Sequence, residues 1–250
     1  MLPLGLNPDL DTERLAREYA DHKCVQIRNF LDEASAARLE AALPSLPWRL
    51  ILQDDTKQNL YLTREEFAAR PPEEQRRLMA GMQRRAAEGI GHLYLVYPMI
   101  NAALYGWDAG HVIHELTEFL NSKPVIEFAR AISGKPGITK LDAHASCFLP
   151  GHYLNSHVDD GEIDERQVAY TIGFTRGWKS DWGGMLLVWD GHGDVRFGRC
   201  PSFNTMTVFD GRIPHSVSAI APFAPKARYT VAGWFRDDPP AQKNKGDASH

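Results

Sequence analysis

Cysteine and net charge are both scarce in this sequence. Its 250 residues include three cysteines, Cys24, Cys147 and Cys200, an odd number spread along the chain. Because a disulfide framework uses an even number of cysteines, we expect reduced thiols and a cytoplasmic location. The net charge is -4 and the pI is about 6.2, so no excess of basic charge favours binding to the backbone of a nucleic acid.

Long apolar segments are also lacking. No apolar run approaches the roughly 18 residues that a membrane-spanning helix requires. The opening stretch, MLPLGLNPDLDTERL, has neither the basic segment nor the apolar core of a signal peptide, and we expect no membrane association. With 43% hydrophobic residues the chain can bury one substantial core, so we expect a single domain over residues 1–250.

The first half of the chain shows helical periodicity. Apolar residues recur three and four positions apart, which predicts helices over 12–22, 32–43, 71–89, 111–122 and 123–134. Asp32 is a candidate N-cap, and Gly89 and Gly134 are candidate helix ends. Shorter apolar runs predict strands over 23–30, 48–53 and 92–99. Residues 1–138 are therefore predicted to form a mainly helical support region with a few strands.

The pattern changes at about Lys140. Short runs rich in β-branched and aromatic residues are separated by turn formers such as Pro150-Gly151 and Asp210-Gly211. The runs cover residues 140–149, 152–158, 166–175, 185–191, 194–198, 204–211, 215–222 and 227–235. They predict an antiparallel double sheet, a sandwich or jelly roll, over residues 139–237. The expected fold class is α+β, with N-terminal helices buttressing the barrel and a flexible polar tail at 238–250.

One short stretch, HYLNSHVDDG at 152–161, concentrates residues that can bind a metal. His157 and Asp159 are two positions apart, so on a strand their side chains would share a face. Two histidines and one carboxylate leave three positions of an octahedral ion open, as in non-haem iron(II) oxygenases. His215, which begins a later strand run, is the candidate second histidine.

A candidate anion site follows on the last predicted strand. Arg228 is near the start of ARYTVAGWF, and its planar guanidinium can hold a carboxylate through two parallel hydrogen bonds. Thr230 and Trp234 share the face of Arg228 by alternation. Tyr153, four positions before His157, is a candidate phenol donor to the same anion.

Together these motifs carry a family resemblance. YLNSHVDD, IPHSVSAI, ARYTVAGWF and the WGGML at 182–186 resemble the prolyl-hydroxylase group of iron(II)/2-oxoglutarate-dependent oxygenases, over roughly residues 140–237. The resemblance implies a double-stranded β-helix barrel. It also implies Fe(II) held by His157, Asp159 and His215, with 2-oxoglutarate and O2 as co-reactants and the distal carboxylate of 2-oxoglutarate on Arg228.

Within that group, this chain most resembles hydroxylases that act on a proline of a ribosomal protein. The resemblance is carried by the tyrosine before H-x-D-D and by the run 166–175. The implied activity is hydroxylation of an unactivated C–H, on a prolyl residue of a protein or peptide. Many relatives have an aromatic residue at the position of Gly173, so the resemblance leaves a phenol contact to 2-oxoglutarate to Tyr153 or Tyr170.

Two other functions remain open at this point. One is the same chemistry on a free amino acid or another small molecule. The long segment 51–67, expected as a loop, would suit either a peptide groove or a lid, so it does not choose between the two kinds of substrate. The other is a metal-binding jelly-roll or cupin-like protein that does not use 2-oxoglutarate, which would have no need for Arg228. The identity of the substrate, the hydroxylated carbon and the oligomeric state have no signature in these residues.

The remaining histidines have less specific explanations. His192 and Asp194 also fit H-x-D, but flanking glycines predict a hairpin turn. His111 and His114 are expected on a solvated helix face, because neither zinc-protease motif is present. His144 and His152 are expected to be polar strand or loop residues, with contact to a substrate as the alternative.

Overall fold

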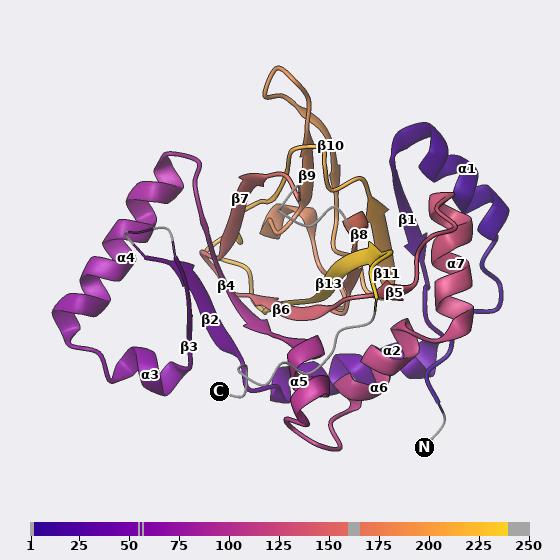
Figure 1. Cartoon of the computed structure of the whole chain (residues 1–250). Helices are drawn as coiled ribbons and strands as arrows, with labels where there is room; N and C mark the ends of the chain where they lie inside the picture. The colour runs from indigo at the N-terminus through magenta and orange to yellow at the C-terminus, as the bar shows by residue number, and fades with distance from the viewer. Residues whose placement is uncertain (1–2, 55, 57, 160–165, 240–250) are drawn as a thin grey trace.

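A computed structural model describes residues 3–54, 56, 58–159 and 166–239. Within these ranges the strands form one 13-stranded antiparallel sheet that curls on itself, and helices lie around its outside (Figure 1). This arrangement confirms the predicted α+β class with a jelly-roll barrel. No helix in the described ranges is both long and apolar enough to cross a membrane.

The helices predicted from apolar periodicity are all present. Asp32 caps its helix as expected, since its carboxylate accepts a hydrogen bond from the backbone N–H of Ser35 at 2.9 Å. Gly134 takes the left-handed conformation that ends a helix. Two further helices are too short to show a period in the sequence. The α-helices are α1 Thr12–His22, α2 Glu33–Ala42, α3 Arg64–Ala68, α4 Pro72–Ala87, α5 Met99–Tyr105, α6 Val112–Leu120 and α7 Lys123–Ser133.

The predicted strands are present too, and the sequence missed one between them. The strands are β1 Cys24–Arg28, β2 Arg49–Gln53, β3 Asn59–Leu62, β4 His92–Tyr97, β5 Lys140–Leu141, β6 His144–Phe148, β7 Tyr153–His157, β8 Arg166–Gly173, β9 Leu186–Trp189, β10 Val195–Arg199, β11 Thr205–Phe209, β12 His215–Val217 and β13 Arg228–Arg236. The expectation of a loop over 51–67 was wrong, because β3 pairs with β2 and α3 follows with a capping box between Thr63 and Glu66.

Strands from both halves of the chain belong to the same sheet. The order is β1-β11-β8-β13-β6-β4-β7-β12-β9-β10, with β2 and β3 attached to β4, and β5 attached to β13. β1 pairs with β11, and β4 pairs with both β6 and β7. The first half of the chain therefore supplies strands of the barrel wall in addition to the supporting helices.

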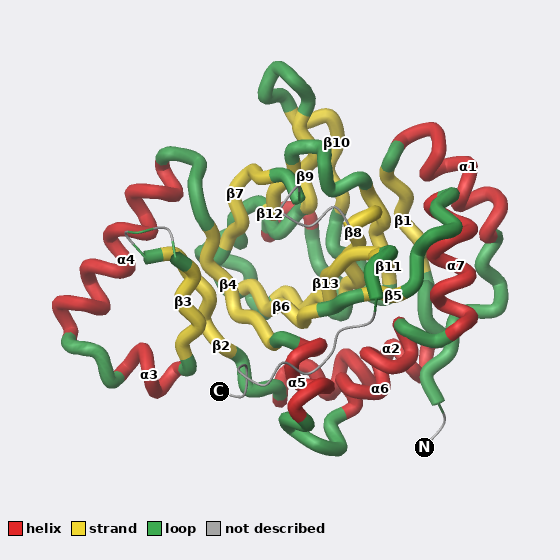
Figure 2. Tube along the Cα trace, viewed as in Figure 1, coloured by secondary structure: helices red, strands yellow, loops and turns green. Residues whose placement is uncertain are grey.

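The main hydrophobic core lies between the helices and the outer face of the sheet. Leu39 of α2, Leu116 of α6 and Ile132 of α7 are buried in one cluster with Val168 of β8 and Val231 of β13. Each such side chain contributes roughly 1.5–3 kcal/mol by leaving water. Figure 2 shows these helices gathered on one side, while α3 and α4 lie beside β2 and β3.

The first residue of the predicted flexible tail, Asp238, is held in place by hydrogen bonds. Asp238 accepts hydrogen bonds from Lys140 and Arg236, each at 2.6 Å, and these ion pairs hold residue 238 against the end of the sheet. Residues 240–250 of the predicted tail lie outside the described residues.

The cap of α2 gives a first test of the fold. An Asp32→Ala variant should lower the free energy of unfolding by about 1 kcal/mol, because the backbone N–H of Ser35 loses its acceptor. Urea denaturation followed by circular dichroism measures this loss. Asp32→Asn retains an acceptor oxygen and should stay close to the wild type; an equal loss in both variants would contradict the capping role.

Candidate active site

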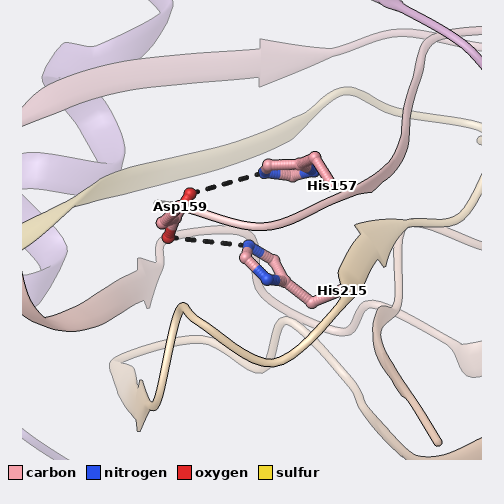
Figure 3. A group of neighbouring side chains, drawn as sticks. All are labelled: His157, Asp159 and His215. Atoms are coloured by element: carbon pink, nitrogen blue, oxygen red, sulfur yellow. Dashed lines mark ion pairs between the residues drawn. The ribbon is translucent and has the colours of Figure 1, made fainter. Parts of the chain in front are cut away.

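His157, Asp159 and His215 converge at one end of the barrel interior. His157 ends β7 and His215 begins β12, and the two residues are paired directly across that ladder. Nε2 of His157 lies 3.6 Å from Oδ1 of Asp159, and Nε2 of His215 lies 3.7 Å from Oδ2 (Figure 3). One ligand atom from each residue falls within 4.8 Å of the others. This donor set, two imidazoles and one carboxylate, suits a divalent metal with open positions.

Asp159 reaches the histidines from a bend and not from the strand. The sequence places it on the same strand face as His157, whereas β7 ends at His157 and the chain then turns. The backbone N–H of Asp159 donates to the carbonyl of Gly211 at 2.8 Å, which fixes the bend against the loop before β12. Asp159 therefore meets the two histidines because of this bend, which Gly211 holds in place, and not because of strand alternation.

Both imidazoles are held in the tautomer that leaves Nε2 free to bind a metal. Nδ1 of His157 lies 2.9 Å from the carbonyl of Asn155, and Nδ1 of His215 lies 2.9 Å from the carbonyl of Ile213. A carbonyl only accepts, so each Nδ1 carries the hydrogen and each Nε2 presents its lone pair. Burial lowers the pKa of His215, which further favours the neutral ring.

The carboxylate of Asp159 is enclosed by two residues that the sequence did not single out for this role. Nε1 of Trp234 donates to Oδ2 of Asp159 at 2.9 Å. On the other side, a Cβ atom added to Gly211 would lie 2.4 Å from the same oxygen, so the carboxylate rests directly on the glycine backbone. In the sequence, Gly211 was assigned only to a turn and Trp234 only to a strand face.

The triad opens into a cavity of about 340 Å³, and Arg228 lines it from β13. Arg228 is 3% exposed, and among the described residues no carboxylate forms an ion pair with it. One terminal nitrogen donates to Oγ1 of Thr230 at 3.1 Å, Thr230 is bonded to Oγ of Ser146 at 2.6 Å, and Nε of Arg228 has no partner. Burial lowers its pKa to about 10. A buried guanidinium without an anion is costly, so the site is built to receive one.

The alternation along β13 is as the sequence predicts, because Arg228, Thr230 and Trp234 all line the cavity. Tyr153 does not. Leu154 pairs with Val217 and His157 with His215, so β7 carries one extra residue between the two pairs, a β-bulge.

The bulge reverses the alternation and turns Tyr153 outward. Its hydroxyl donates to the carbonyl of Met82 at 3.4 Å, and its ring packs on the cluster between α4 and β4. The expectation that Tyr153 contacts the anion in the cavity was wrong for this reason.

Tyr170 does not offer its phenol to the cavity either, since its hydroxyl donates to the carbonyl of Asp142 at 2.8 Å. At Gly173, a Cβ would lie 2.3 Å from the carbonyl oxygen of Ser202, so no side chain fits there. Tyr94 on β4 also lines the cavity, and the centroid of its ring lies 4.8 Å from that of Phe148, on which it stacks. The sequence missed Tyr94 because β4 lies far outside the region expected to form the barrel.

The other histidines have mainly structural places. His192 and Asp194 form the expected β9–β10 turn, in which Oδ1 of Asp190 accepts from both backbone N–H groups. The expectation of a solvated helix face was wrong for His111, which caps α6, and for His114, whose Nε2 lies 2.7 Å from the carbonyl of Trp107.

The hydrogen bond from Trp234 gives a direct test of the carboxylate position. A Trp234→Phe variant should bind Mn(II) about 10- to 100-fold more weakly, because Asp159 loses the donor that orients it. Titration followed by the electron paramagnetic resonance signal of free Mn(II) measures the change. Trp178→Phe is the matched control, since Trp178 donates to the carbonyl of Gly183, outside the triad; equal affinities in both variants would contradict the role of Trp234.

Comparison with known proteins agrees with this geometry. Residues 143–236 match the family model of the 2OG-Fe(II) oxygenase superfamily. No curated protein sequence matches the chain.

Three solved structures share the fold. A Pseudomonas putida prolyl-4-hydroxylase is 19% identical, with a TM-score of 0.52 over 94% of this chain and 98% of that one. An oxidoreductase of the 2OG-Fe(II) oxygenase family from Burkholderia pseudomallei is 14% identical, with a TM-score of 0.64 over 97% and 99%. A Trichoplax adhaerens prolyl hydroxylase, in complex with a hypoxia inducible factor oxygen degradation domain peptide fragment, is 17% identical, with a TM-score of 0.59 over 91% of both chains.

Proposed function

We propose that this Fe(II)- and 2-oxoglutarate-dependent oxygenase, whose residues 143–236 match the family model of the 2OG-Fe(II) oxygenase superfamily, hydroxylates a prolyl residue of a protein or peptide. The observation that carries the proposal is a single cavity lined both by a triad suited to a metal and by a buried arginine that has no carboxylate partner among the described residues. A jelly-roll metal protein without an acidic co-reactant has no use for that arginine.

The residues present fit the cofactors that the superfamily uses. His157, Asp159 and His215 would hold Fe(II) through two neutral imidazoles and a carboxylate, a suitable donor set for this ion. When bound, Fe(II) with 2-oxoglutarate and O2 supplies the oxidation that converts a substrate C–H to C–OH, while 2-oxoglutarate becomes succinate and carbon dioxide. The chain itself supplies binding and orientation.

Several other cavity residues have a task in this scheme. Arg228 binds the distal carboxylate of 2-oxoglutarate, and Thr230, through its link to Ser146, fixes the direction of the guanidinium. Tyr94 offers a phenol at the same end of the cavity, next to Phe148. Apolar walls from β9, β11 and β12 exclude water and so strengthen these polar contacts.

Support for a prolyl substrate comes from the fold comparisons. Two of the solved structures described above are prolyl hydroxylases, and one of these holds a peptide fragment. The chain's three cysteines are all free of disulfides, which supports a reducing, cytoplasmic setting for the reaction.

Anaerobic titration of Fe(II) and 2-oxoglutarate tests the cofactor part of the proposal. The wild type should develop a visible charge-transfer band, and His157→Ala should not. A wild type that binds the metal without the band would favour a cupin-like role instead.

Mass spectrometry tests the substrate part. Blocked peptides with one central proline should gain one oxygen atom only with Fe(II), 2-oxoglutarate and active enzyme. Oxidation of free amino acids or other small molecules, with all peptides unchanged, would contradict the prolyl assignment while leaving the cofactor assignment intact.

A further inference from the structure

His144 lines the cavity and has no role in the site described so far. It begins β6, and its ring centroid lies 6.2 Å from that of Trp234. Across the β6–β13 ladder it pairs with Ala232, whose small side chain leaves room beside the imidazole. Within the described part of the chain, neither ring nitrogen has a hydrogen-bond partner, and His144 is not one of the three residues grouped as metal ligands. The imidazole is therefore available to a ligand.

The surroundings of His144 favour a neutral ring that donates to an oxygen. Burial lowers the pKa of His144 to about 4, and the charge of Arg166 acts in the same direction against the opposing effect of Asp159. The guanidinium of Arg166 lies 3.9 Å from the ring centroid of Trp234, and its Nε has no partner. A neutral imidazole N–H beside an arginine makes this corner of the cavity suitable for an acceptor oxygen.

His144 and Arg228 lie at opposite ends of the cavity wall. β6 runs from His144 to Phe148, and the ring of Phe148 packs 5.0 Å from the guanidinium of Arg228. Four residues of strand span about 13 Å. With the carboxylate of 2-oxoglutarate at the Arg228 end, the end around His144 and Arg166 is left for the substrate that is hydroxylated.

We propose that this end of the cavity binds a carbonyl oxygen of the substrate, and that His144 is the residue that selects an amide-linked prolyl residue over a free amino acid. The inference rests on the proposed function and adds to it a subsite and its chemistry. His144 acts as a hydrogen-bond donor to the carbonyl, in a region kept electropositive by Arg166.

The charges of the cavity explain why a free amino acid is disfavoured. Among the described residues that line it, Asp159 is the sole carboxylate, and its oxygens face the two histidines of the triad and Trp234. The ammonium group of a free amino acid would find no free carboxylate among the described lining residues and would lie close to Arg166, which is costly in a buried space. The nitrogen of a prolyl residue inside a chain is an uncharged amide, and its neighbouring carbonyls are acceptors.

A comparison of His144→Leu with His144→Gln tests the subsite. The probes are blocked peptides with one central proline and free L-proline, and the readouts are the added oxygen, the KM for peptide and the charge-transfer band with 2-oxoglutarate. His144→Leu should raise the KM for peptide about tenfold, because one buried donor is lost. His144→Gln keeps an N–H donor and should stay within about threefold of the wild type. The band should be the same in all three proteins.

The possible failures are separable. If the wild type hydroxylates peptides and His144→Leu does so with an unchanged KM, the subsite is wrong and the proposed function stands. If His144→Leu weakens the band, His144 belongs to the metal or cosubstrate side, which also overturns the inference. If the wild type prefers free L-proline, both the subsite chemistry and the prolyl-peptide assignment fail. Peptides left unmodified by a wild type that shows the band count against both as well.

Discussion

A Gly211→Ala variant is expected to fold but to bind a divalent metal at least about 100-fold more weakly than the wild type. The added Cβ would lie 2.4 Å from Oδ2 of Asp159 and 3.0 Å from its Cβ and Cγ. Real Cβ atoms do not approach other atoms so closely, so the carboxylate must move away from the two histidines. No left-handed backbone conformation is needed at residue 211, so the whole effect comes from the displaced ligand.

Titration with Mn(II), followed by its electron paramagnetic resonance signal, measures this loss, and circular dichroism confirms the fold. Gly191→Ala is the matched control, because a Cβ at that position would meet nothing within 4 Å and the backbone there is also unstrained. We expect the control to keep the wild-type affinity. Wild-type affinity in Gly211→Ala would mean that Asp159 is not held where the structure places it.

The same glycine illustrates what the sequence could and could not predict. His157, Asp159 and His215 were found from residue type, spacing and strand context, all of which are local properties. The contact between Gly211 and Asp159 depends instead on how the loop before β12 meets the bend after β7, which no local pattern encodes. Similarly, Trp234 could be placed on the correct face of β13 by alternation, but its hydrogen bond to Asp159 required the tertiary structure.

The sequence placed Tyr153 wrongly and missed Tyr94, and both errors concern how strands pair. The outward position of Tyr153 results from a β-bulge between Leu154 and His157, and a bulge leaves no regular sequence signature. Tyr94 reaches the cavity because β4, from the helical first half, pairs with β6 and β7 of the barrel. Sequence periodicity finds strands reliably here, but it does not reveal which distant strands are neighbours.

Arg228 should show opposite effects on cosubstrate binding and on stability when it is replaced by methionine. Arg228→Met removes the guanidinium but keeps a long side chain against Phe148 and Thr230. The Kd for 2-oxoglutarate should rise about 100-fold or more, because its distal carboxylate would lose a charged, bidentate partner inside a buried cavity. The measurement is the charge-transfer band as a function of 2-oxoglutarate concentration, at saturating Fe(II) without oxygen.

The free energy of unfolding of the ligand-free protein should increase in Arg228→Met. In the absence of an anion, the buried guanidinium has no carboxylate partner among the described residues, and its lowered pKa, about 10, reflects that cost. Removing it should therefore stabilise the ligand-free protein by about 1 kcal/mol or more in urea denaturation. Arg228→Lys separates charge from geometry, since it keeps a cation but loses the planar fork, and it should bind 2-oxoglutarate with intermediate affinity.

The combination of the two effects is what identifies a binding residue. A structural arginine would destabilise the fold when removed, and a surface arginine would change neither quantity. Gain of stability with loss of cosubstrate affinity arises only where an unfavourable buried charge is retained for a ligand. If Arg228→Met instead destabilises the protein and leaves the charge-transfer titration unchanged, Arg228 serves packing, and the carboxylate of 2-oxoglutarate must be sought elsewhere in the cavity.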